Sequence, residues 1–222
     1  MVQALLQAKA NPNLRNGEGD TPLILAVTSG SILCCKLLTA AKASVIQQDA
    51  DGFTAVHFAA GFGYLSILSH FIDANPTACD IKSKSGVSPA LCAILNDHVE
   101  CLIYLLRREK HIVTSRVGDR NTLLHVAAQE GNPAMCQALL SCGAIVATQN
   151  NNGDTPIDIV LTVFKDSSLP AAKRHGLREC FLLLMKHREI QELEEEKQVS
   201  NKSTPSGFLL AACKGNTAEL QR

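Results

Sequence analysis

The sequence predicts an all-α protein that consists of stacked helix–turn–helix units. A hydroxyl residue opens the same apolar pattern at intervals of 33 or 34 positions. Two apolar stretches with helical spacing follow each opening residue, and polar segments rich in turn-forming residues separate one pair from the next. One such pair cannot bury its apolar face alone, whereas a stack of pairs can. The opening residues are Thr21, Thr54, Ser88, Thr122 and Thr155.

The first helix of each unit is predicted from these opening residues. A Thr or Ser hydroxyl can cap the helix start, and a following proline fits the first turn. The small residues that come next make a slim helix, which neighbouring helices can approach closely. The segments are TPLILAVTSG, TAVHFAAGFG, SPALCAILND, TLLHVAAQEG and TPIDIVLTVF. The motif residues are Thr21, Pro22, Thr54, His57, Ser88, Pro89, Thr122, His125, Thr155 and Pro156.

A second helix is predicted after the glycine that closes most of these segments, because glycine commonly ends a helix. Links such as NLRNGEGD, QQDADGF and TQNNNGD contain Asx residues and glycines, which favour tight turns between one pair of helices and the next. The second-helix segments are SILCCKLL, YLSILSHFI, HVECLIYLL, NPAMCQALL and, displaced along the chain, LRECFLLLM.

The period and the TPLH-x-A-A-x-x-G pattern resemble the ankyrin repeat over nearly the whole chain. The resemblance implies helix–turn–helix units that are joined by β-hairpin-like fingers and stacked into a curved solenoid. The predicted boundaries are a partial repeat at 1–16, repeats at 17–49, 50–82, 83–116 and 117–149, an interrupted repeat at 150–202, and a partial repeat at 203–222.

The fifth unit departs from the pattern. Gly176 is expected to fill the glycine slot about twelve residues late, so that VFKDSSLPAAKRH is an insertion between the two helices. The charged segment HREIQELEEEKQVSNK replaces the next finger and is expected to prolong the second helix. In the fourth unit Arg120 takes the place of the usual finger glycine, so a distorted finger is expected there.

The two partial repeats predict open ends. Residues 1–16 match a second helix without its first, and residues 203–222 match a first helix and the opening of a second. Val2, Leu5 and Leu6 are therefore expected to lie uncovered at one end, because terminal repeats normally need a polar outer face. This pattern favours a fragment or alternative product of a longer array.

Composition excludes several classes of protein. The 222 residues include 21 basic and 21 acidic ones, so no excess of positive charge favours a nucleic-acid partner. The longest apolar runs, such as CFLLLM, are far shorter than the ~18–20 residues that span a bilayer, and no secretory signal is visible. Nine cysteines without a regular framework suit reduced thiols in the cytoplasm or the nucleus.

The two motif histidines are interpreted as structural. His57 and His125 hold the fourth position of the pattern, where the resemblance implies a hydrogen bond to backbone near the turn. The other units carry Ile24, Leu91 and Asp158 at that position, so no chemistry common to the units requires an imidazole.

The cysteines are interpreted as small buried hydrophobes. Most of them fill second-helix slots that other units give to Ile, Leu or Met, and Cys92 fills an apolar first-helix slot. No Cys-x-x-Cys pair and no zinc-ligand spacing occurs, so neither a metal site nor a disulfide is expected. The slot residues are Cys34, Cys35, Cys101, Cys136 and Cys180. Exposed thiols on turns or outward faces are expected at Cys79, Cys142 and Cys213.

No catalytic residue and no cofactor are predicted. The glycines of GEG and GFG lack a preceding buried strand and a Walker lysine, so a phosphate loop is disfavoured. The favoured function is a non-enzymatic interaction module that binds another protein. The alternative is the regulatory or substrate-recruiting part of a larger enzyme or membrane protein.

The partner is expected on the fingers and on the exposed positions of the first helices, which line the concave face in ankyrin-like stacks. Phe62 is the most suggestive residue, because exposed aromatic side chains often anchor interfaces. Single surface aromatics also occur without function, so that reading stays open. The candidate partner-binding residues are Phe53, Phe62, Asn96, Arg120, Gln129 and Glu130.

Overall fold

The computed structural model describes residues 1–166 and 168–201, with side chains up to Leu193. The chain divides into a first compact unit, Met1–Leu184, and a second one that starts at Met185. Among the described residues, strands are confined to two short segments, β1 (Arg116–Val117) and β2 (Asn121–Thr122). The fold is therefore the all-α repeat structure that the period predicts.

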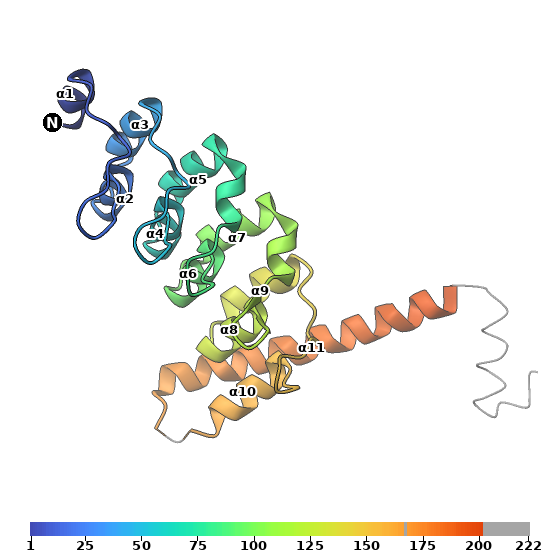
Figure 1. The fold of residues 1–222 in the computed structure, drawn as a ribbon. Helices are drawn as coiled ribbons and strands as arrows, with labels where there is room; N and C mark the ends of the chain where they lie inside the picture. Colours follow the sequence, from blue (N-terminus) through green and yellow to red (C-terminus); the bar gives the residue numbers. More distant parts are fainter. Residues whose placement is uncertain (167, 202–222) are drawn as a thin grey trace, which may run out of the picture. The chain divides into compact units, whose positions relative to one another are not determined.

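In the first compact unit, first and second helices alternate along the chain and form two rows of stacked helices (Figure 1). A short helix, α1 (Val2–Gln7), precedes them, and the 3₁₀ turns η1 (Pro76–Asp80) and η2 (Lys110–Thr114) follow two of the second helices. The first helices are α2 (Pro22–Thr28), α4 (Ala55–Gly61), α6 (Pro89–Leu95), α8 (Leu123–Glu130) and α10 (Pro156–Phe164). The second helices are α3 (Ile32–Ala40), α5 (Leu65–Ala74), α7 (Val99–Arg108), α9 (Pro133–Ser141) and the long α11 (Ala171–Asn201).

The opening hydroxyl residues cap the first helices as their position predicts. The Thr21 Oγ1 accepts a hydrogen bond from the Ile24 N–H at 3.2 Å, and the Ser88 Oγ accepts one from the Leu91 N–H at 3.3 Å. The following prolines, Pro22, Pro89 and Pro156, occupy the first turn of their helices.

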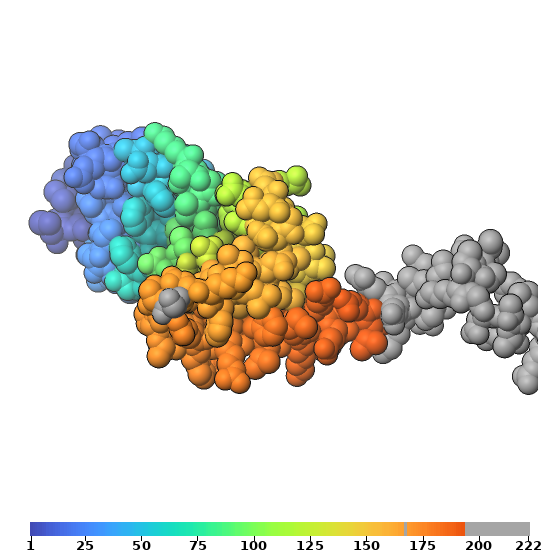
Figure 2. Space-filling view, turned by 90° about the horizontal axis from the view of Figure 1, so that it is seen from below, coloured from blue at the N-terminus to red at the C-terminus, as the bar shows by residue number. Residues whose placement is uncertain are grey.

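The core lies between the two rows of helices and between successive repeats. The repeats of the first compact unit form one continuous surface in the space-filling view (Figure 2). The core is built from Leu, Ile, Val and Ala, in keeping with an aromatic content of only 4%. The alanine pairs Ala59–Ala60 and Ala127–Ala128 are completely buried, because their small side chains let neighbouring helices approach the backbone.

The fifth unit contradicts one expectation. Gly176 does not end a helix, since it lies inside α11. A Cβ at this position would collide with the carbonyl oxygen of Gly131, so the glycine permits a close approach between two backbones. The inserted residues mostly lengthen α10 and the start of α11 and leave a short connection between Phe164 and Ala171.

Cys79 lies on a turn, but its exposure was predicted wrongly. The side chain is 1% exposed, because η1 folds back from α5 and packs against α6. Cys142 is half-buried just after α9, and Cys213 lies outside the described residues.

The second compact unit is described from Met185 to Asn201, all of it helical as the continuation of α11. This is the helix that the charged segment predicts. Arg188 and Glu192 form an ion pair one turn apart, with 2.8 Å between Nε and Oε1. Ile190 and Leu193 are exposed.

Candidate partner-binding surface

The turns of the fingers are stabilised by side-chain oxygens that accept hydrogen bonds from backbone N–H groups of the same turn. The Asn16 Oδ1 accepts from the N–H groups of Glu18 and Asp20 at 3.0 and 2.8 Å. The Asp49 Oδ1 accepts in the same way from Asp51 and Phe53 at 2.9 and 2.8 Å. Each finger is thus a preformed turn that a short polar side chain fixes from inside.

The fourth finger lacks such an acceptor, because Val117 stands where the other fingers have Asn, Asp or Ser. Instead β1 and β2 pair antiparallel, with Val117 opposite Asn121. Arg120 adopts a left-handed backbone with a φ of 57°, which a glycine would take without strain. The glycines of the other fingers share this left-handed backbone, and their N–H groups close the turn to the carbonyl three residues earlier. The Arg120 N–H bonds to the Gly118 carbonyl instead, so this finger is distorted as predicted.

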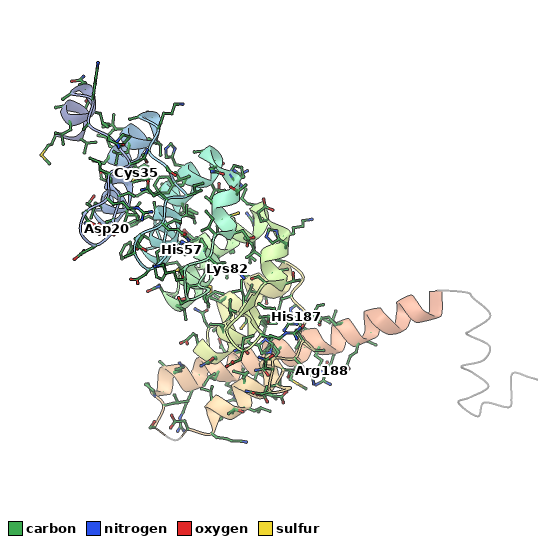
Figure 3. All side chains as sticks on the ribbon, viewed as in Figure 1. Asp20, Cys35, His57, Lys82, His187 and Arg188 are labelled. Carbon is green, nitrogen blue, oxygen red and sulfur yellow. The ribbon has the colours of Figure 1, made fainter. Side chains whose placement is uncertain are left out.

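The histidines tie each helix start to the finger of the following unit. The Thr54 N–H donates to the Nδ1 of His57 at 3.0 Å, so the proton of the neutral ring is on Nε2, which donates to the Val87 carbonyl at 3.0 Å. The Thr122 N–H donates likewise to the Nδ1 of His125 at 3.1 Å. Figure 3 labels His57 among the side chains of the stack.

Burial lowers the pKa of His57 and of His125. Both rings are 1% exposed, and each of their nitrogens already has a backbone partner. Neither imidazole can therefore act as a general base towards a substrate. In the fifth unit Asp158 performs the capping role, with its Oδ2 accepting from the Thr155 N–H at 2.9 Å.

The most distinctive exposed feature is a set of four rings on the second full unit, here called the aromatic cluster. The ring centroids of Phe53 and Phe58 are 6.0 Å apart, those of Phe58 and Phe62 are 6.3 Å apart, and those of Phe62 and Tyr64 are 5.8 Å apart. The chain has seven Phe and two Tyr, so four of its nine such residues lie within twelve positions. Phe62 is 46% exposed.

The remaining candidate residues lie at exposed positions further along the stack. Asn96, Arg120, Gln129 and Glu130 are all exposed. The Asn96 amide donates to the Cys92 carbonyl at 2.9 Å. The Glu130 carboxylate forms an ion pair with Lys173 of α11 at 3.3 Å, so it is partly neutralised.

Two exposed apolar residues beside the aromatic cluster were missed in the sequence. Leu25 on α2 is 48% exposed and Leu95 on α6 is 53% exposed. Leu25 holds the same repeat position as Phe58, and Leu95 the same position as Gln129. The repeat register was the signal that could have identified them.

The described part of the chain contains no group of three or more His, Cys, Asp or Glu side chains arranged to hold a metal ion. Within the same residues, every helix is too short or too polar to cross a membrane.

Comparison with known proteins identifies the repeats. The family described as "Ankyrin repeats (3 copies)" matches residues 1–85, 58–150 and 91–166, and such repeats are a general protein–protein interaction module. The chain is 32% identical over 124 residues to the "Probable E3 ubiquitin-protein ligase XBOS31" of Oryza sativa subsp. japonica, which is 55% of the chain and 28% of that protein.

Two further relatives extend the match. Rabankyrin-5 of Homo sapiens is 28% identical over 198 residues, or 89% of the chain and 15% of that protein. The B-cell lymphoma 3 protein homolog of Mus musculus is 26% identical over 161 residues, or 71% of the chain and 36% of that protein. The chain spans well under half the length of each of these relatives. On the family match over residues 1–166, the chain belongs to the ankyrin-repeat family.

Proposed function

We propose that the chain is a non-enzymatic interaction module, and that another protein binds its fingers and the exposed side of its first helices. The aromatic cluster is the observation that carries this proposal. A group of contacting, partly exposed rings is concentrated on one unit of a chain that is otherwise poor in aromatic residues. Interfaces are enriched in such rings, whereas most other exposed positions contribute little binding energy.

The cluster is held in place before any partner arrives. Phe53 packs edge-on against His57, with 5.4 Å between ring centroids, and Phe58 lies between Phe53 and Phe62. Tyr64 lies against the neighbouring unit, where its hydroxyl would be 3.2 Å from a Cβ at Gly30. Rings that are already fixed lose little side-chain entropy on binding, which favours affinity.

Leu25 and Leu95 extend the apolar area to the helices on both sides of α4. Asn96, Gln129 and Glu130 follow on the next two first helices, and Arg120 lies on the finger of the fourth unit. This order places an apolar centre beside a polar margin, which is the usual composition of a protein interface.

A photo-reactive phenylalanine analogue at position 62 tests the proposal in cells that express the intact protein. The matched control places the same analogue at Leu33, which is 66% exposed on the second helix α3. We expect a discrete protein adduct from position 62 that is absent from position 33. Adducts of equal pattern from both positions, or none from position 62, would overturn the proposed surface.

With the adduct's partner purified, Phe62→Ala should weaken binding by about 1–3 kcal/mol, while Leu33→Ala leaves the affinity unchanged. Isothermal titration calorimetry measures the difference. Unchanged helix content in circular dichroism must accompany it, so that a loss of affinity reports the surface and not the fold.

A second candidate function follows from the similarity to XBOS31, which is named a probable E3 ubiquitin-protein ligase. The matching 124 residues cover only 28% of that relative. A substrate-recruiting role for the same surface within a larger enzyme is therefore the alternative. The two roles differ in one result: in the alternative, the partner bound at position 62 is chemically modified in cells that contain the full-length protein.

A further inference from the structure

Two cysteine thiols meet at the junction between the fourth and fifth repeats. Cys136 lies on α9 and Cys180 on α11, 44 positions apart in the sequence. Their sulfur atoms are 3.8 Å apart, and both side chains are 0% exposed. At this distance the two sulfur atoms are in van der Waals contact. They would have to approach each other by about 1.8 Å to reach the S–S bond length of about 2.05 Å.

The repeat register explains why, within the described repeats, such a pair occurs at this junction. We count the opening hydroxyl residue of each repeat as position 1. Cys136 is then at position 15 of its repeat, and Cys180 corresponds to position 14 of the next repeat once the insertion is left out. Lining up the sequence in this way gives Cys35 with Ile67, Leu68 with Cys101, and Leu102 with Met135. Only the last junction places a cysteine in both slots.

We propose that Cys136 and Cys180 form an oxidative modification site, at which a disulfide of the glutathione class converts the dithiol into an intramolecular disulfide. The reaction proceeds by thiol–disulfide exchange through a mixed disulfide. The S–S bond of the oxidant breaks, the Sγ–Sγ bond between Cys136 and Cys180 forms, and two thiol protons leave on two glutathione thiols. The protein loses two electrons and the oxidant gains them.

The surroundings of the pair set how the reaction starts. The thiol–thiol hydrogen bond, and burial after it, raise the pKa of Cys136, so the attacking thiolate is scarce in the closed structure. Exchange therefore requires that α11 opens locally. Leu182 on α11 is 59% exposed, so part of this helix already faces solvent. Single elements open locally at a lower free energy than the whole protein unfolds.

The product would be a covalent clamp. The bond would close a loop that contains the connection between Phe164 and Ala171, and would tie α11 covalently to α9. A crosslink across 44 residues restricts the unfolded chain, which corresponds to a rise of roughly 8–16 °C in melting temperature for a protein of this size.

The intact chain, incubated with glutathione disulfide at neutral pH, tests the site. Free thiols are alkylated under denaturing conditions, and peptide mass spectrometry locates any crosslink. We expect Cys136 and Cys180 to be joined, while Cys35 and Cys101, in the equivalent slots of other units, remain reduced. Thermal melting followed by circular dichroism should show the rise given above, reversed by dithiothreitol.

The variants Cys136→Val and Cys180→Val keep an apolar side chain in each slot and should abolish both the crosslink and the rise. The proposal is overturned if Cys136 and Cys180 stay reduced in the folded native chain, or pair mainly with other cysteines. A specific crosslink that leaves the melting temperature unchanged, or lowers it, overturns the clamp. These readouts need no binding partner, so they are independent of the interaction surface.

Discussion

Two glycines inside helices show how the regular stack differs from the fifth repeat. Gly61 in α4 has room for a side chain, since a Cβ there would meet its nearest neighbours at 3.7 Å, which is ordinary contact. Gly176 in α11 lies against the backbone of Gly131, where no Cβ fits. In the regular stack, repeated apolar slots hold helices at a distance that side chains set. In the fifth repeat, one missing side chain sets the distance.

The largest effect on stability is expected when these two glycines are replaced by alanine. Gly176→Ala should lower the free energy of unfolding by about 3 kcal/mol, because the added methyl group collides with a backbone oxygen that cannot rotate away. Gly61→Ala, the matched control, should raise it by about 0.5–1 kcal/mol through helix propensity. Urea unfolding of both variants measures the difference. Equal stability of the two would show that α11 does not approach Gly131 closely.

The regular stack has its own sensitive points at the histidine links. His125→Ala removes the acceptor of the Thr122 N–H and the donor to the Asp154 carbonyl, at 3.1 and 3.0 Å. We expect a loss of about 1–2 kcal/mol in the free energy of unfolding, because the Thr122 N–H is buried and the Asp154 carbonyl is partly buried. The control is Arg120→Ala, at an exposed side chain of the adjacent finger. An unchanged urea midpoint for His125→Ala would show that the histidine does not stabilise the fold.

Much of this scaffold could be predicted because the sequence states each slot five times. Because Thr21, Thr54 and Thr155 hold the same repeat position, the sequence alone identifies them as helix caps. Ile24 and Leu91 hold the position of His57 in other repeats, which indicates that the histidine has a structural role and not a chemical role common to the repeats. The conformation of Gly176 could not be predicted in this way. Its role as a helix end was predicted wrongly, because a glycine that ends a helix and a glycine that admits another backbone look the same in one sequence.

The candidate surface was predicted less completely, for a related reason. The exposure of Phe62 follows from its repeat position, whereas the ion pair between Glu130 and Lys173 depends on how the insertion lengthens α11. Burial of Cys79 depends on a 3₁₀ turn that the repeat pattern does not specify. Contacts within the repeat register are readable from periodicity, and contacts that an insertion creates are not.

Low pH should destabilise the regular stack in particular, because the two buried histidines belong to it. Burial lowers the pKa of His57 and His125 below their usual value of about 6.5. Between the folded and unfolded pKa values the unfolded chain binds more protons, so stability present above pH 6.5 is lost as pH falls through that window. The loss is at most about 1.4 kcal/mol per pH unit for each ring.

The measurement is the urea midpoint between pH 7.5 and pH 5.5. The wild-type midpoint should fall over this range, and the double variant His57→Ala/His125→Ala should show a flatter profile from a lower starting stability. Parallel profiles for the two proteins would assign the pH dependence to other groups.

The smallest effect concerns the ion pair between Lys173 of α11 and Glu130 of α8. Lys173 and Glu130 are 33% and 40% exposed at their side chains, so water screens their attraction. Glu130→Gln should lower the free energy of unfolding by only about 0.2–1 kcal/mol, far less than Gly176→Ala, although both changes lie at the same contact between α8 and α11. Raising the salt concentration to 1 M should shrink the difference between wild type and Glu130→Gln, because exposed charges are screened. It should leave the Gly176→Ala deficit in place, since a steric collision does not depend on ionic strength. A Glu130→Gln deficit as large as that of Gly176→Ala, or one that is insensitive to salt, would mean that charge and not backbone approach holds the fifth repeat to the stack.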